Sequence, residues 1–208
     1  MYLTRTPRTV RSFFREVVWN VPGTSKDLYL TFDDGPIPEV TPWVLYTLAE
    51  YDAKATFFCI GANCATNPDI LERIRREGHT VGNHTYDHLP GRKTPLRTYL
   101  RNVLRCQEFT GTRLFRPPYM SLTLAQGRAL RSRFEVVLWD VLSGDFDADI
   151  DGAKCLENVL VAVRPGSIVL FHDSLGAEER VRYALPRTLE HFAKQGYRFR
   201  ALDERALR

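Results

Sequence analysis

Short apolar runs alternate along this chain with segments whose apolar positions recur every three or four residues. The runs predict buried strands, and the three-to-four spacing predicts helices with one buried face. The expected strands lie at 28–30, 53–60, 79–82, 114–115, 134–139, 167–171 and 197–199. The expected helices begin at Thr41-Pro42, Asn67-Pro68 and Thr94-Pro95, and further helices cover 122–132, 156–163 and 186–195.

Strands and helices alternate about seven times, which indicates an α/β fold with a parallel sheet. Polar residues follow the strands at Asp33, His84, Arg116, Asp145 and His172. In an α/β barrel the residues that follow the strands gather on one rim, where the chemistry takes place. We therefore expect a TIM-like (β/α) barrel of about seven parallel strands rather than an open sheet.

The first 25 residues contain a further segment with helical spacing, over 8–19. Its apolar positions are Val10, Phe13, Phe14, Val17 and Val18, with Arg8, Arg11 and Arg15 on the other face. Such a helix can cover the closed end of the barrel or lie on an anionic membrane surface, and we favour the first because 12 residues make a weak anchor. We expect an amphipathic helix within residues 1–25, followed by one catalytic domain over 26–208.

Composition and charge narrow the class of protein. A chain of 208 residues with 44% hydrophobic and 26% charged residues suits one globular domain. The net charge of +4 comes without a contiguous basic run, so we expect no nucleic-acid partner. The sequence shows no signal peptide and no membrane span, which predicts a cytoplasmic protein. The unpaired spacing of Cys59, Cys64, Cys106 and Cys155 predicts reduced, mostly buried thiols.

Two adjacent carboxylates, Asp33 and Asp34, end the first buried strand, and Gly35-Pro36 then turns the chain. Neighbouring acids disfavour joint ionisation unless a cation holds them. His84 and His88 supply partners at i and i+4, a spacing that on one helical turn directs both imidazoles to one side. Two histidines and one aspartate with open positions are typical of a catalytic zinc site.

Three other strand ends carry candidate chemistry. Arg116 opens a rigid Arg-Pro-Pro-Tyr turn, where its guanidinium can hold a carboxylate ionised and the Tyr119 N–H can donate to an oxyanion. His172 ends an apolar strand as a candidate general acid, with Asp145 as the partner that keeps its imidazole protonated. Structural roles, a surface turn and a core histidine, remain the alternatives for each feature alone.

The segments TFDDGP, HTYDH, RPPY, WDVLSGDF and VLFH occur in this order between residues 31 and 172. Together they resemble the five motifs of the NodB-homology polysaccharide deacetylase family, carbohydrate esterase family 4. The resemblance implies a distorted (β/α) barrel that removes acetyl groups from N- or O-acetylated sugars with one divalent metal ion. Zinc is the expected ion, with cobalt and nickel as alternatives.

The resemblance also implies a role for each matching position. Asp33 resembles the catalytic base, and Asp34, His84 and His88 resemble the metal ligands. Arg116 resembles the residue that tethers the base, Tyr119 the oxyanion donor, His172 the acid and Asp145 its partner. The expected substrate-binding residues are Pro118, Tyr119, Trp139, Phe146 and Leu170.

Three positions depart from the family pattern and bear on the substrate. Met120 stands where the family usually has glycine, Phe146 where it usually has tryptophan, and Leu142 where many members have aspartate. We expect an enzyme that releases acetate from an acetylated glycan. The alternatives are a silent metal-containing carbohydrate-binding domain and a deacylase for a small non-sugar amide. A glycoside hydrolase using Asp33 and Asp34 is disfavoured because neighbouring strand residues point oppositely.

Overall fold

The computed structural model describes residues 3–7, 16–23 and 25–203. Within these residues the strands are β1 (Val17–Val18), β2 (Asp27–Asp33), β3 (Thr56–Cys59), β4 (Thr80–Asn83), β5 (Leu114–Phe115), β6 (Glu135–Val137), β7 (Val141–Leu142), β8 (Ile168–His172) and β9 (Arg198–Phe199). The α-helices are α2 (Thr41–Ala49), α3 (Gly61–Thr66), α4 (Pro68–Arg76), α5 (Leu96–Thr110), α6 (Leu124–Leu130), α7 (Gly152–Ala162) and α8 (Glu178–Lys194). Two 3₁₀ turns, η1 (Gly91–Lys93) and η2 (Pro118–Met120), complete the described elements.

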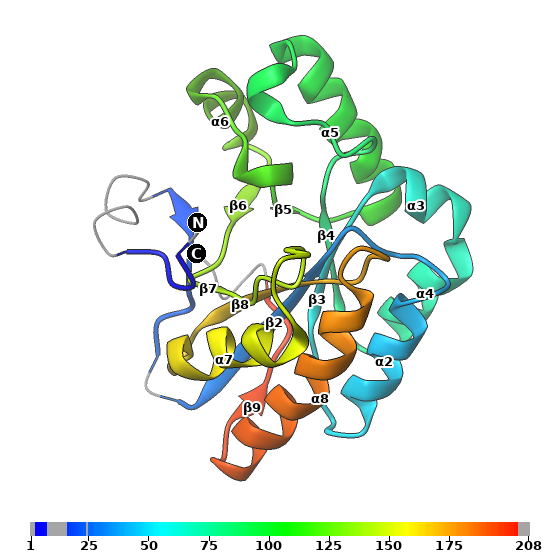
Figure 1. Cartoon of the computed structure of the whole chain (residues 1–208). Helices are drawn as coiled ribbons and strands as arrows, with labels where there is room; N and C mark the ends of the chain where they lie inside the picture. The colour runs from blue at the N-terminus through cyan, green and yellow to red at the C-terminus, as the bar shows by residue number, and fades with distance from the viewer. Residues whose placement is uncertain (1–2, 8–15, 24, 204–208) are drawn as a thin grey trace.

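The strands form one curled sheet in the order β1-β6-β5-β4-β3-β2-β8-β7, and β9 pairs with the start of β2. Every strand pair is parallel. Residues 138–140 connect β6 directly to β7, although these strands lie near opposite ends of the order. The two edges of the sheet therefore face each other across a narrow gap, which gives the expected distorted α/β barrel (Figure 1).

The N-terminal helix prediction is wrong where the structure describes it. Val17 and Val18 form β1, in register with Val136 and Val137 of β6. Two adjacent β-branched residues suit a strand that covers an otherwise unpaired edge. Residues 8–15, the rest of that predicted helix, lie outside the described residues. The strand adds to the barrel wall, so the boundary expected at residue 25 does not separate a helix from the domain there.

The main hydrophobic core is formed by side chains of the central strands that pack against helices α2, α4, α7 and α8. A second core lies under α5 and α6 and contains Tyr99, Val103, Phe115 and Leu130. Figure 1 shows α5 and α6 side by side at the end of the molecule away from α7 and α8. This part of the barrel therefore has its own apolar support, which matters for the surface it carries.

The sequence predicted that the last helix begins at Pro186, but α8 begins eight residues earlier, at Glu178, and Pro186 lies inside it. Proline removes one backbone donor and normally marks a helix start or break. Here Val181, Leu185 and Leu189 are fully buried on one face of the helix, and this packing outweighs the lost hydrogen bond. None of the helices in the described part of the chain has the length and apolarity to span a bilayer.

Candidate active site

The catalytic and metal-ligand residues expected from the sequence come together at one end of the barrel. Asp33 is the last residue of β2 and is in register with His172, the last residue of β8. His84 and Arg116 directly follow the neighbouring strands β4 and β5. Because all these strands are parallel, their carboxyl ends share one rim, as the barrel prediction required.

Arg116 holds Asp33 from below the rim. Its side chain is fully buried and donates from Nη1 to Asp33 Oδ1 at 2.7 Å and to Thr31 Oγ1 at 2.8 Å. Its remaining nitrogens donate to the carbonyls of Val137 and Leu138. The buried guanidinium has every edge paired and fixes one oxygen of the Asp33 carboxylate by a charge-assisted hydrogen bond. Asp33 Oδ2 is left towards the site, 3.8 Å from His84 Nε2.

Asp34, His84 and His88 form a cluster in which one ligand atom from each lies within 4.8 Å of the others. Asp34 Oδ1 lies 3.6 Å from His84 Nε2 and 3.2 Å from His88 Nε2. That oxygen is buried and accepts no hydrogen bond from the described residues. A buried oxygen without a donor, facing two imidazole nitrogens, fits a divalent cation.

The backbone places the three ligands differently from the sequence expectation. Residues 84–88 form a loop, not the helical turn that the i, i+4 spacing predicted, and His88 has a φ of 55°. Asn102 of α5 shapes this loop, since its Oδ1 accepts from the N–H groups of Tyr86 and Asp87. Asp34 has a φ of 83°, so its side chain leaves the strand pattern and reaches the same site as Asp33. The expectation that the two carboxylates point oppositely is therefore wrong.

The protonation pattern of the cluster also suits a cation. His84 Nδ1 lies 2.7 Å from the Arg116 carbonyl, which can only accept, so Nδ1 carries the proton and Nε2 presents its lone pair. Burial lowers the pKa of His84, which keeps the imidazole neutral. Burial alone would raise the pKa of Asp34, but the nearby His88 and His172 side chains lower it overall and keep the carboxylate charged.

His172 and Asp145 form a tight pair beside this cluster. Asp145 is fully buried, accepts from the His172 N–H at 2.6 Å, and lies 2.8 Å from His172 Nδ1. Burial alone would lower the pKa of His172, but the Asp145 carboxylate overrides it and raises the pKa to about 9. The imidazole therefore carries a proton at neutral pH and can donate it.

The expected substrate-binding residues fall into exposed and buried groups. Tyr119 is 69% exposed and its ring lies 4.6 Å from the His88 ring, while Phe146 is 48% exposed and meets the His172 ring edge-on at 5.6 Å. Trp139 is half-buried, and Leu170 and Pro118 are buried. Tyr119 and Phe146 are thus placed to contact a substrate, whereas binding roles for the other three stay predictions.

The turn that carries Tyr119 presents a free backbone donor. Tyr119 has a φ of 57°, and its N–H has no hydrogen-bond partner among the described residues. The next two N–H groups close the turn onto the carbonyls of Pro117 and Pro118. An N–H fixed in such a turn can donate to a developing oxyanion, and this role of Tyr119 stays a prediction.

Asp173 is a site residue that the sequence analysis did not single out. It is 1% exposed and accepts from the Gly35 N–H at 3.0 Å and from Thr41 Oγ1 at 2.6 Å. A Cβ on Gly35 would lie only 2.0 Å from Asp173 Oδ2, so the Asp-Asp-Gly turn requires glycine there. The Thr41 hydroxyl thus binds Asp173, and helix α2 begins after Val40 without a side-chain cap. The available signal was an acid directly after His172 at the end of an apolar strand.

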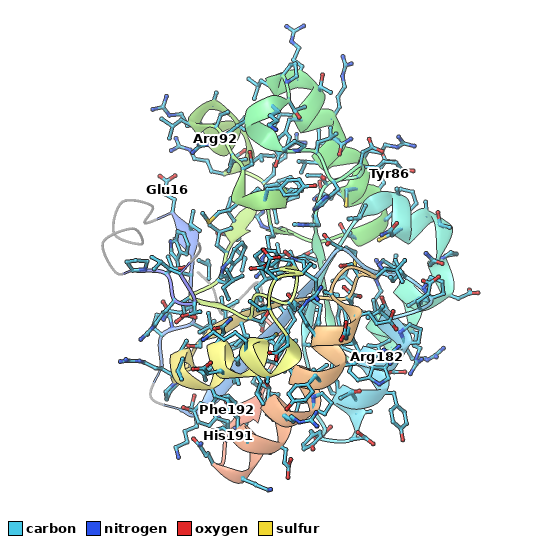
Figure 2. The ribbon with its side chains drawn as sticks, in the orientation of Figure 1. Glu16, Tyr86, Arg92, Arg182, His191 and Phe192 are labelled. Carbon is cyan, nitrogen blue, oxygen red and sulfur yellow. The ribbon has the colours of Figure 1, made fainter. Side chains whose placement is uncertain are left out.

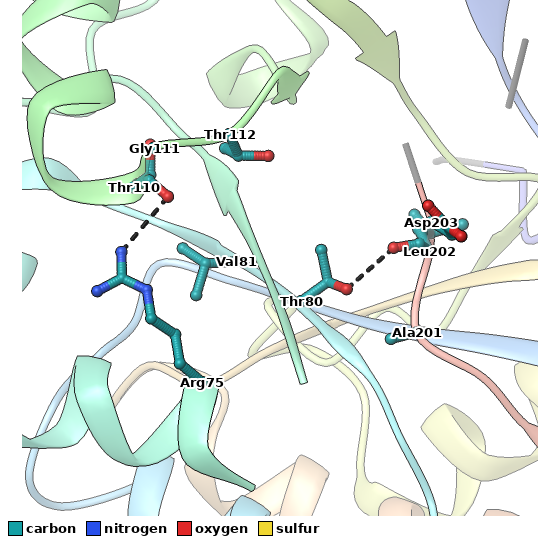
Figure 3. Close-up of a pocket in the computed structure, with 9 residues that line it drawn as sticks. All are labelled: Arg75, Thr80, Val81, Thr110, Gly111, Thr112, Ala201, Leu202 and Asp203. Carbon is teal, nitrogen blue, oxygen red and sulfur yellow. Dashed lines mark hydrogen bonds between the residues drawn. The ribbon is translucent and has the colours of Figure 1, made fainter. Parts of the chain in front are cut away.

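A separate cavity of about 440 Å³ opens at the other end of the sheet, near the first residue of β4 (Figure 3). It is lined by Arg75, Thr80, Val81, Thr110, Gly111, Thr112, Ala201, Leu202 and Asp203. Thr80 Oγ1 donates to the Leu202 carbonyl across it. None of the expected catalytic or metal-ligand residues lines this cavity, so it is not part of the rim site.

Comparison with known families agrees with this geometry. The family model described as polysaccharide deacetylase matches residues 20–132, more than half of the chain. The chain belongs to the polysaccharide deacetylase family. Its members in carbohydrate esterase family 4 share the curled parallel sheet seen here, so the fold and the family expected from the five motifs are both confirmed.

Several relatives are deacetylases by name. The chain is 35% identical to a peptidoglycan-N-acetylglucosamine deacetylase of Bacillus cereus over 195 residues, covering 90% of this chain and 92% of that protein. It is 38% identical to a chitooligosaccharide deacetylase of Sinorhizobium fredii, covering 73% and 74%. Against the longer peptidoglycan-N-acetylglucosamine deacetylase of Listeria monocytogenes it spans 39% of that protein's length.

Solved structures of family members superpose closely on this chain. The crystal structure of a peptidoglycan N-acetylglucosamine deacetylase in complex with 4-naphthalen-1-yl-N-hydroxybenzamide matches with a TM-score of 0.87 at 30% identity, covering 95% of each chain. A family pseudoenzyme from Bacillus anthracis matches with a TM-score of 0.74 at 25% identity, covering 87% of this chain and 65% of that one. Because the fold also occurs in a pseudoenzyme, activity must be argued from the site residues.

Proposed function

We propose that this polysaccharide deacetylase is a metal-dependent N-deacetylase that releases acetate from N-acetylglucosamine units of a glycan. The observation that carries the proposal is the grouping of three complete parts at one rim. These parts are the cluster of Asp34, His84 and His88, the Arg116–Asp33 pair, and the His172–Asp145 pair. A catalytically silent metal-binding domain of this fold would need neither the Arg116–Asp33 pair nor the His172–Asp145 pair.

Asp34, His84 and His88 are the residues that would hold a divalent ion, with zinc the expected one. Such an ion supplies Lewis-acid polarisation of the acyl carbonyl and of the attacking water. Two neutral imidazoles and one carboxylate leave coordination positions open, as in catalytic rather than structural sites. Asn102 fixes the backbone of the loop between the two histidines and thereby orients them.

The chain's own residues then divide the proton transfers. Asp33, kept ionised by Arg116, takes a proton from the attacking water through its free oxygen Oδ2. The Tyr119 N–H donates to the tetrahedral oxyanion. His172, protonated through Asp145, donates to the departing nitrogen, which is a poor leaving group without a proton.

Named relatives act on peptidoglycan and on chitooligosaccharides, and both descriptions point to N-acetylated glucosamine. Tyr119 and Phe146 provide exposed aromatic faces beside the cluster, which suit the apolar faces of sugar rings. We therefore place the acetamido group of one sugar between Asp33 and His172. The cytoplasmic location expected from the sequence stays a prediction.

Acetate release from chitohexaose, with chelator and with zinc, cobalt or nickel restored, tests the function. Asp33→Asn should keep bound metal while kcat falls by roughly 10²–10⁴, the usual contribution of a general base. Equal activity in Asp33→Asn would remove the role given to Asp33. Binding of chitohexaose with no acetate release under any metal would instead favour the silent carbohydrate-binding domain.

A further inference from the structure

The charge of this molecule is unevenly distributed. Residues 91–133 contain ten arginines or lysines and one acidic residue, Glu108. The whole chain has 29 basic and 25 acidic residues, so the rest of the chain carries an excess of acid. Residues 91–133 comprise η1, α5, β5, η2 and α6 around the second hydrophobic core. We call this part the basic lobe.

Most cations of the basic lobe are exposed and unpaired. Seven of them are exposed and form no salt bridge with any described residue: Arg92, Lys93, Arg97, Arg101, Arg105, Arg128 and Arg133. Arg105 lies over the Tyr86 ring at 3.5 Å. In helices α4 and α8 several cations pair with acids on an adjacent turn, as in Arg182–Glu178 and Arg73–Glu77. The basic lobe lacks this pattern.

Three of the arginines follow one face of α5. Arg97, Arg101 and Arg105 occur at i, i+4 and i+8, which places them in one row about 12 Å long. Like charges at this spacing destabilise a helix. A row of cations that lowers the stability of its own helix, and that forms no salt bridge with a described acid, indicates a binding partner outside the molecule.

The row leads away from the active-site mouth. Arg92 and Lys93 lie in η1, shortly after the metal ligand His88, and the Arg92 N–H donates to Ser121 Oγ beside the Tyr119 turn. Helix α5 then runs from the carboxyl end of β4 back to the start of β5, since the two strands are parallel. The cations therefore begin at the rim and continue down the flank of the barrel. Figure 2 labels Arg92 in the upper part of the view, close to α6.

We propose that the basic lobe binds an anionic glycan chain, one that carries carboxylate groups on its repeating units, and guides it into the active site. This inference rests on the proposed deacetylase function and names the class of its substrate. Arginine suits carboxylates because its planar guanidinium donates two parallel hydrogen bonds. A linear row that starts at the catalytic rim matches an extended polymer whose acetylated sugar occupies the site.

Two other polyanions are less well matched by the same surface. A membrane would contact a broad face, and exposed leucines such as Leu104 and Leu124 are scattered in this lobe rather than joined into an apolar stripe. A nucleic acid would use a series of exposed aromatic rings for stacking, whereas the arginines of α5 have Tyr86 beside them, which Arg105 covers, and the exposed Tyr119 ring lies against His88 at the site. Both become outcomes of the test.

The test compares an acidic with a neutral glycan. End-labelled hyaluronan octasaccharide, in which N-acetylglucosamine alternates with glucuronate, and chitohexaose are titrated with the full-length protein and followed by fluorescence anisotropy. The double variant Arg97→Glu/Arg101→Glu reverses two cations of the row. Arg76→Glu/Arg164→Glu reverses two exposed cations outside the lobe, which also form no salt bridge with a described residue, and so matches the change in net charge.

We expect wild-type protein to bind hyaluronan more tightly than chitohexaose, with an advantage that shrinks as salt is added. The variant Arg97→Glu/Arg101→Glu, called the row variant, should raise the Kd for hyaluronan roughly tenfold, because it removes two exposed ion pairs with the glycan and adds two repulsions. Its Kd for chitohexaose and its kcat for acetate release from chitohexaose should stay unchanged, and the matched control should behave as wild type.

Equal affinity for the two glycans, or an equal loss in the matched control, overturns the proposal. So does a result in which the row variant loses binding to phosphatidylglycerol vesicles or to an oligonucleotide but keeps hyaluronan, since the partner is then a membrane or a nucleic acid. These binding results stand even if neither glycan yields acetate. Absent acetate release would count against the proposed function, not against the anionic partner.

Discussion

Replacing Arg116 by methionine tests the pairing that keeps Asp33 ionised. Arg116 is fully buried and donates to Asp33, Thr31 and the carbonyls of Val137 and Leu138. Methionine fills similar space but leaves the 3% exposed Asp33 carboxylate without its cation. Breaking a buried pair by removing one partner costs about 3–5 kcal/mol, a large part of the 5–15 kcal/mol that stabilises a typical domain.

A double-mutant cycle separates the charge pair from lost packing. Asp33→Asn in the Arg116→Met background removes the orphaned carboxylate, so the double variant should be more stable than the sum of the single losses predicts, by about 1–3 kcal/mol. The free energy of unfolding is measured by urea titration with chelator present, using the fluorescence of the three tryptophans. Arg97→Met, at an exposed unpaired arginine, is the control and should change stability by less than about 0.5 kcal/mol.

The reasoning fails if Arg116→Met costs less than about 1 kcal/mol, or if the two substitutions add without coupling. Either result would mean that Asp33 is held by other contacts or is protonated in the folded protein. Activity provides a second readout, because Arg116→Met should also lose acetate release at neutral pH.

Three further predictions concern the acid, the metal loop and the oxyanion turn. Asp145→Asn should move the basic limb of the profile of kcat against pH from about pH 9 to lower pH, because His172 loses the carboxylate that raises its pKa. In wild type the His172–Asp145 pair stabilises the folded state fully below about pH 6.5, and this contribution is lost as the pH rises through about 9. Asn102→Ala should raise the Kd for zinc at least about tenfold at unchanged kcat under saturating metal, measured by competition with a chelating dye, and an unaltered Kd would dismiss its part in shaping the loop. Met120→Gly should increase the free energy of unfolding, measured by urea titration, by about 0.5–1 kcal/mol, because Met120 has a φ of 51°, a conformation that glycine adopts without strain. A loss of stability would show that the methionine side chain contributes more than its backbone conformation costs.

The position of the candidate catalytic residues at the ends of strands was predictable from the sequence, because local residue patterns encode both the strands and the polar residues that follow them. Apolar runs mark the central strands, and the polar residue that ends each run must lie at a carboxyl end if the sheet is parallel. That logic placed Asp33, Arg116 and His172 correctly. The four cysteines, expected as buried thiols, are free and buried in the structure.

Backbone conformation at the site was not predictable in the same way. The i, i+4 spacing of His84 and His88 predicted a helical turn, yet the loop uses a positive φ at His88 that Asn102 supports from 14 residues later in the chain. Val17 and Val18 fit either a helix or a strand by spacing. The unpaired edge of β6 selected the strand.

The sequence by itself determined the α/β class, the order of most elements and the positions of the candidate acids, bases and ligands, since these depend on periodicity and residue type. Tertiary structure alone decided how Asp173, 138 residues away, holds Gly35 in its turn, and how separated cations in residues 91–133 form one basic surface. The cations of the basic lobe are separated in the sequence. Those of α5 nevertheless share a face, because helical spacing places every fourth residue on the same side. Contacts between distant segments form only when the core packs, so residue patterns within a window do not contain them.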